Sequence, residues 1–79
     1  MDKFLNLEKY LTKQTARSIK LTFKEIERVI GCTLCPSAYK YKEYWYPSKT
    51  HTLPNVIIST GYNISCVNIF DEYIILQKP

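Results

Sequence analysis

The stretch Leu21-Thr22-Phe23-Lys24-Glu25-Ile26-Glu27-Arg28-Val29-Ile30-Gly31 carries signals for both ends of one short helix. Thr22 followed three residues later by Glu25 is a capping-box pattern, in which each side chain accepts a hydrogen bond from the other residue's backbone N–H. Gly31 stands where a left-handed residue commonly ends a helix. Four apolar residues recur at helical spacing and predict one buried face: Phe23, Ile26, Val29 and Ile30. We therefore expect the rest of the chain to pack around this helix.

The length and composition predict one small domain that spans residues 1–79. The chain has 79 residues, of which 46% are hydrophobic, and this fraction is ordinary for a globular protein. A domain of this size buries only about 60% of its unfolded surface, so assembly into a homo-oligomer is a reasonable expectation. The N-terminus carries Asp2 and Glu8 among its apolar residues, which is unlike a secretory signal peptide. We expect a cytoplasmic protein without a membrane segment.

The chain before the capped helix predicts one more helix and a short strand. An apolar stripe at helical spacing indicates a helix over about residues 3–13, with Asp2 as a cap; the stripe consists of Phe4, Leu5, Leu7 and Leu11. Residues 14–18 are polar and basic and predict a loop. The alternating segment Ile19–Leu21 predicts a strand.

The chain after the capped helix predicts one or two helices and a hairpin. Pro36 suits a first helical position, and we expect a helix from Pro36 to Trp45 that ends before Pro47. Residues 52–59 predict a fourth helix, although their β-branched run fits a strand equally well. The segments 64–70 and 73–78 predict a β-hairpin, whose intervening Asp71-Glu72 lacks the Gly that a two-residue turn usually needs.

This order of elements predicts an α+β fold that is winged-helix-like, with three to four short helices, a short strand and a C-terminal hairpin. The capped helix and the helix after it would form the helix-turn-helix pair, and the hairpin would form the wing. A plain α+β domain, with helices packed on a small antiparallel sheet, would have the same order of elements.

Several motifs in the central and C-terminal chain occur together. The matching residues are Leu21-Thr22-Phe23, Glu25-Ile26-Glu27, Gly31, Leu34, Pro36-Ser37-Ala38, Trp45-Tyr46, His51 and Gly61-Tyr62. Over residues 20–78 the chain resembles a family of small bacterial and phage proteins known only as a domain of unknown function. It departs from the family pattern at Cys35, Tyr46 and Thr60. The resemblance implies one autonomous domain and a phage or mobile-element source, and it implies no activity.

The formal net charge is +4, and the positive surplus lies in the first part of the chain. Residues 1–50 contain ten Lys or Arg and five Asp or Glu, whereas residues 51–79 contain one Lys, one Asp and one Glu. A basic surface attracts phosphates and other anions. A Lys-rich surface that is simply solvated explains the same composition.

The segment from Tyr39 to Tyr46 is the strongest candidate for a binding site, because it combines four tyrosines, one tryptophan and two lysines. Aromatic rings stack on nucleobases and ammonium groups pair with phosphates. We expect Tyr39, Lys40, Lys42 and Tyr46 to bind a ligand. The segment has no Arg, Asn or Gln, so reading of base edges in duplex DNA is a weaker expectation than stacking or backbone binding. The alternative is that Tyr44 and Trp45 belong to the core and the remaining tyrosines cover it.

A second basic group could also contact phosphates, and it consists of Arg17, Lys20, Lys24 and Arg28. The alternative is pairing with acidic residues on a solvated helix face. His51 would lie in a polar loop or at a helix cap, and it could bind phosphate when it is protonated.

The cysteines give only a weak metal signal. Cys32 and Cys35 with His51 and Cys66 could form a zinc set, but one C-x-x-C pair is poor support for it. The alternation around Cys66 favours a place in the core. Cys35 with His51 is the one available nucleophile–base pair. We expect no metal, no cofactor and no catalytic site.

Together these patterns predict a non-enzymatic, basic, winged-helix-like module that contacts nucleic acid, with a possible regulatory role. A first alternative is a phage-type anti-defence protein that sequesters a cyclic or linear nucleotide messenger or blocks a host immune protein. A second alternative is a protein-interaction domain that uses Tyr39 and Tyr46 as anchors.

Overall fold

The capped helix forms as its sequence predicts. In the computed structural model, which describes residues 4–47 and 52–79, helix α2 spans Phe23–Ile30. The Glu25 N–H donates to Thr22 Oγ1 at 3.1 Å, and the Thr22 N–H donates to Glu25 Oε1 at 3.0 Å. Gly31 has a φ of 79°, which is the left-handed conformation, and its N–H donates to the Glu27 carbonyl at 2.9 Å. Both ends of α2 are therefore satisfied by local hydrogen bonds.

Within the described residues, the strands form one antiparallel sheet of three in the order β1-β3-β2. Strand β1 (Ser18–Thr22) contains the predicted short strand, and β2 (Asn63–Asn68) and β3 (Tyr73–Gln77) form the predicted hairpin. The central strand is β3, so the two remaining strands form the edges of the sheet.

A β-bulge in β2 changes which of its side chains face the core. Ile64 lies opposite Leu76 and Cys66 lies opposite Ile75, so Ser65 is an extra residue in the ladder. The regular alternation is thereby broken, and Ile64 and Val67 both pack against the core. Cys66 is exposed, and the prediction that it belongs to the core is wrong, because the bulge shifts it to the other face.

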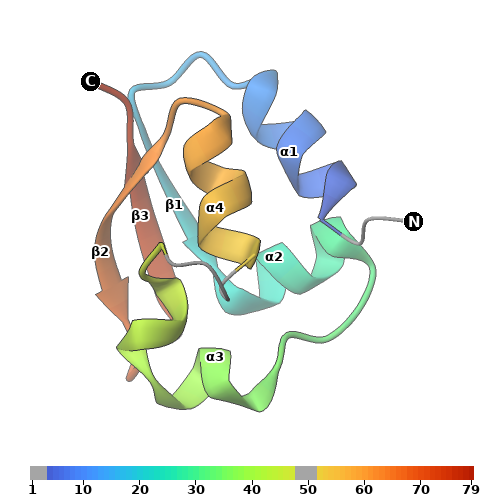
Figure 1. Cartoon of the computed structure of the whole chain (residues 1–79), viewed down its shortest axis with the longest axis vertical. Coiled ribbons are helices and arrows are strands. Elements are labelled where there is room, and N and C mark those ends of the chain that lie inside the picture. The colour runs from blue at the N-terminus through green and yellow to red at the C-terminus, as the bar shows by residue number, and fades with distance from the viewer. Residues whose placement is uncertain (1–3, 48–51) are drawn as a thin grey trace.

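Helices α1 (Leu5–Thr12), α2 and α4 (Thr52–Ser59) lie on the same side of the sheet (Figure 1). The resulting two-layer arrangement buries the apolar face of each helix. The buried core consists of Phe4, Leu7, Leu11, Leu21, Phe23, Ile26, Ile30, Leu34, Ala38, Trp45, Leu53, Ile57, Tyr62, Ile74 and Leu76. Leu5, which the sequence places in the apolar stripe of α1, is on the outer side of that helix and is exposed. The predicted cap Asp2 lies outside the described residues.

Residues 52–59 form the helix α4 and not a strand. Pro54 lies in the first turn, where its missing N–H costs no intrahelical hydrogen bond. After the helix, Gly61 takes a φ of 94°, and its N–H donates to the Ile58 carbonyl at 3.0 Å. Burial of Leu53 and Ile57 on one side of α4 overrides the strand preference of the β-branched run.

The predicted continuous helix from Pro36 to Trp45 is wrong. The α-helix α3 covers only Pro36–Lys40, Tyr41 is extended with φ −126° and ψ 124°, and a 3₁₀ turn, η1, covers Lys42–Trp45. In a continuous helix, residues 38 and 45 would be separated by about 10 Å along the axis. The break at Tyr41 lets the Trp45 indole N–H donate to the carbonyl of Ala38 at 3.0 Å.

The turn between β2 and β3 has four residues, 69–72, and not the two that separate the predicted strands. The side chain of Asn68 accepts the Asp71 N–H at 2.9 Å and donates to Asp71 Oδ2 at 3.2 Å. Glu72 has a φ of 58°, which is uncommon for a residue other than glycine, and its carbonyl accepts the N–H of Phe23 at 2.8 Å. The turn is therefore joined to the start of α2.

The structure is a small α+β domain in which the described residues form four α-helices and a three-stranded antiparallel sheet. Across residues 4–47 and 52–79, none of the helices has both the length and the apolar character that crossing a bilayer requires.

Candidate ligand-binding cleft

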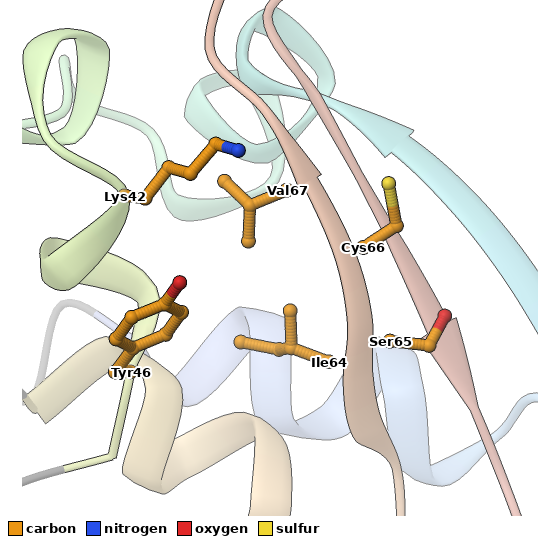
Figure 2. A pocket seen from close by; sticks show the side chains of 6 residues that line it. All are labelled: Lys42, Tyr46, Ile64, Ser65, Cys66 and Val67. Atoms are coloured by element: carbon orange, nitrogen blue, oxygen red, sulfur yellow. The ribbon is translucent and has the colours of Figure 1, made fainter.

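An open cleft lies between the segment that contains η1 and the edge strand β2. It has a volume of about 280 Å³. Its lining residues are Lys42, Tyr46, Ile64, Ser65, Cys66 and Val67. Figure 2 shows Lys42 and Tyr46 on one side, with Ile64 and Val67 pointing toward them from β2. Two residues of the predicted binding segment, Lys42 and Tyr46, therefore share one cleft.

Trp45 fixes the position of this segment. Its side chain is fully buried, and its ring stacks on Phe23 with a centroid distance of 4.9 Å and an interplanar angle of 21°. Phe23 is the first residue of α2, so the capped helix holds η1 in place. The neighbouring Tyr46 is 52% exposed, because the chain turns extended before Pro47 and directs this residue away from the core.

The β2 side of the cleft follows from the bulge. Ile64 and Val67 are half-buried and give the cleft an apolar floor. The side chains of Ser65 and Cys66 extend from the strand on the side away from Lys42 and Tyr46 (Figure 2). Because β2 is an edge strand, one row of its backbone groups lies outside the sheet ladder.

The chemistry of the cleft suits an anion that also carries a flat or apolar group. The ammonium of Lys42 can pair with a phosphate or a carboxylate. The exposed ring of Tyr46 can stack on a flat group, and Ile64 and Val67 can contact an apolar one. Neither reaction chemistry nor a metal is needed for this kind of binding.

Tyr39 does not reach the cleft. Its ring is half-buried and packs edge-on against Phe23 with a centroid distance of 5.2 Å and an interplanar angle of 85°. Burial, a hydrogen bond to the Glu27 carboxylate and the negative charges of Glu27 and Glu72 together raise the pKa of Tyr39 to about 12. Glu27 Oε2 also accepts the Leu34 N–H at 2.8 Å. The structure therefore places Tyr39 in the packing between α2 and α3.

The other residues of the segment divide between surface and core. Lys40 and Tyr41 are exposed, and Tyr41 retains 58% of its accessible surface. Trp45 is buried, which confirms its interpretation as a core residue, whereas Tyr44 is half-buried and packs edge-on against Trp45 at 5.3 Å. Burial raises the pKa of Tyr44. The sequence does not predict that Tyr41 is exposed and Tyr44 half-buried, because an unbroken helix gives no reason to distinguish the two residues.

The second basic group lies elsewhere. Arg17, Lys20, Lys24 and Arg28 are all exposed. The Lys20 Nζ lies 4.3 Å from the centroid of the Tyr73 ring. The two hydrogen bonds with Thr22 hold the pKa of Glu25 below its usual value, and the charges of Arg28 and Lys20 lower it further. Because β1 and β2 are opposite edges of the sheet, Lys20 and the cleft are not brought together.

The cysteines do not form a metal site within the described part of the chain. Cys32, Cys35 and Cys66 are free and exposed. Residues 4–47 and 52–79 contain no group of three or more His, Cys, Asp or Glu side chains that could hold a metal ion. His51, a predicted phosphate contact and a member of the zinc set considered above, lies outside the described residues.

Comparison with known proteins assigns the chain to a family without assigning an activity. No curated protein and no solved structure matches it. One family model, described as Domain of unknown function (DUF7662), matches residues 4–79. The match covers the segment that carries the resemblance and extends through helix α1. The chain belongs to the family described as Domain of unknown function (DUF7662).

Proposed function

We propose that this protein is a non-enzymatic, basic module that binds single-stranded nucleic acid at the cleft. The observation that carries the proposal is that the Lys42 ammonium and the Tyr46 ring line the same open cleft. Stacking of a base on an aromatic ring contributes about 1–3 kcal/mol per base, and it tolerates any base because every base has a flat face. A phosphate beside the stacked base would pair with Lys42.

Exposed groups next to the cleft extend this surface along the chain. Lys40 and Tyr41 directly precede Lys42 and are exposed, so a second ring and a second ammonium are available to a neighbouring nucleotide. The net charge of +4 favours encounter with a polyanion. A protein that binds nucleic acid would meet this ligand in the cytoplasm, and we propose that location.

The helix geometry favours single strands over duplex DNA. Helix α3 has five residues and ends before Lys42, so it is too short to present this segment along a major groove. The segment 39–46 also has no Arg, Asn or Gln to pair with base edges. Stacking and phosphate pairing remain as the recognition chemistry.

We also propose a distant winged-helix relationship for the fold. The strand order β1-β3-β2 and the sequence α1, β1, α2 before the hairpin support it. In this interpretation α3 and η1 are an insertion and α4 is the third helix. The exposed residues of α4 carry no charge, namely Thr52, Asn55, Ile58 and Ser59, so a recognition helix is not part of the proposal.

A fluorescence titration with labelled single-stranded oligonucleotides and a matched duplex tests this function. We expect tighter binding of the single strand, and an affinity that falls with salt by a log–log slope of about −0.7 for each phosphate contacted. The double variant Lys42→Ala/Tyr46→Ala should lose most of the affinity. Lys13→Ala removes one charge at the end of α1, away from the cleft, and is the matched control. Absent binding at low salt, or equal losses in both variants, would refute the proposal.

A second candidate is capture of a single cyclic or linear nucleotide messenger, as in an anti-defence protein. The limited volume of the cleft, about 280 Å³, favours it, because a space of this size suits one small ligand rather than a long strand. Calorimetry with a panel of mononucleotides and cyclic dinucleotides separates the two candidates. Binding of one nucleotide with no gain in affinity for longer oligonucleotides would favour the messenger.

A further inference from the structure

Phe70 is the most exposed large apolar side chain among the described residues. It retains 94% of its accessible surface, in the turn between β2 and β3. The hairpin prediction treats it only as the end of a strand. Aromatic residues, Phe among them, are enriched at protein–protein interfaces relative to the rest of the surface.

The turn that carries Phe70 is held in one shape. The hydrogen bonds between Asn68 and Asp71 close it, and the Glu72 carbonyl ties it to the N–H of Phe23. An ordered turn loses little conformational freedom when Phe70 is buried by a partner. Asp71 and Glu72 are exposed next to Phe70, so the three residues form an acidic tip with an aromatic centre.

The cleft of the same molecule has the complementary chemistry. It offers the Lys42 ammonium beside an apolar floor of Ile64 and Val67 and the ring of Tyr46. Its volume of about 280 Å³ exceeds that of an engineered protein cavity of about 150 Å³ that binds benzene. A phenyl ring therefore fits the space, and the carboxylate of Asp71 would lie near an ammonium.

We propose that two copies of this chain form a two-fold dimer, in which each copy inserts Phe70 into the cleft of the other and pairs Asp71 with Lys42. The tip is acidic and the cleft carries the Lys42 ammonium, so their opposite charges favour a second copy of this chain as the partner. Phe70 lies three residues beyond Val67, in the turn that follows β2, so tip and cleft are close together in the chain of each copy. Reciprocal insertion then closes the assembly at two copies. The dimer also adds apolar burial to a domain whose own core is small.

Sedimentation equilibrium of the full chain without nucleic acid, from about 1 µM to about 1 mM, tests the dimer. We expect a monomer–dimer equilibrium, and we expect Phe70→Ser to raise its Kd by about tenfold or more. Phe70 is almost fully exposed in the monomer, so this variant should fold normally, which circular dichroism checks. Tyr10→Ser removes another exposed aromatic ring, on α1, and should leave the Kd unchanged.

A charge exchange supplies a second and independent readout. Lys42→Glu and Asp71→Lys should each weaken the dimer, and the double variant should restore it, because the pair is reversed. Phe70→Ser leaves Lys42 and Tyr46 in place, so it should lose the dimer and keep its affinity for nucleic acid, and the two proposals therefore succeed or fail separately. A monomer at every concentration, a dimer that Phe70→Ser leaves intact, or a double variant no better than the single ones would overturn the proposal.

Discussion

At the scale of single residues, Tyr39 makes the stability of the fold sensitive to alkaline pH. Its pKa is raised from 10.0 to about 12, so the folded chain keeps this proton at pH values where the unfolded chain loses it. The unfolded state is then favoured as pH rises from about 10 toward about 12. We expect Tyr39→Phe to show a weaker fall in unfolding free energy across this window. Urea unfolding at a series of pH values measures this free energy. If it depends on pH in the same way in both proteins, the raised pKa of Tyr39 is not its cause.

Trp45 is the residue on which the position of the cleft depends. In Trp45→Phe the buried carbonyl of Ala38 loses its donor, which we expect to cost about 1–3 kcal/mol of unfolding free energy. The ligand affinity should fall as well, since η1 carries Lys42. Chemical denaturation and the nucleic-acid titration measure the two effects. Tyr41→Phe is the matched control, because Tyr41 is exposed, and it should change stability by less than about 0.5 kcal/mol.

At the scale of elements, the capping box of α2 stabilises the helix on which Trp45 stacks. We expect Thr22→Ala to lower the unfolding free energy by about 0.5–2 kcal/mol. Because the pKa of Glu25 is lowered by folding, its carboxylate stabilises the fold above the ordinary carboxyl pKa of 4.5, and this contribution is lost as pH falls through the folded-state pKa. The unfolding free energy of Glu25→Gln should therefore fall less than that of the unmodified chain as the pH is lowered through the acidic range, which urea unfolding at a series of pH values measures. Identical acid-side profiles for Glu25→Gln and the unmodified chain would contradict this role of the capping carboxylate.

The bulge in β2 yields a prediction about chain length. Deletion of Ser65 leaves Ile64 opposite Leu76 and Cys66 opposite Ile75, and it restores regular alternation with the same faces. We expect this deletion variant to fold, with a loss of about 1 kcal/mol or less. Deletion of Ile75 in the central strand instead turns Ile74 away from the core, and it should prevent folding. Circular dichroism and denaturation distinguish the two variants; equal damage from both would show that the register depends on Ser65.

At the scale of the whole molecule, the proposed dimer would link the stability of the fold to protein concentration. A dimer that forms only from folded chains raises the Tm as protein concentration increases. We expect this dependence for the unmodified chain and not for Phe70→Ser, between about 2 µM and about 200 µM. Differential scanning fluorimetry measures it. Parallel rises in Tm for both proteins would point to an interface that does not involve Phe70.

The elements that could be predicted are those whose signals are local. The caps and apolar face of α2, the short strand before it and the two hairpin strands follow from residues a few positions apart, and the structure has all of them. The place of Lys42 and Tyr46 in one basic, aromatic segment likewise follows from composition. What composition could not show is which rings of that segment face outward.

The tertiary structure decided the rest, because the responsible contacts join residues that are distant in the chain. The break at Tyr41 exists because Trp45 packs on Phe23 and donates to Ala38. The face of Cys66 depends on the strand register against β3, and the cleft exists only where η1 meets β2. By itself, the sequence determined a capped helix, a hairpin and a basic aromatic segment. Tertiary packing determined the rest: the buried Trp45 indole fixes the course of the backbone around η1. Lys42 and Tyr46 therefore lie across the cleft from the apolar side chains of β2.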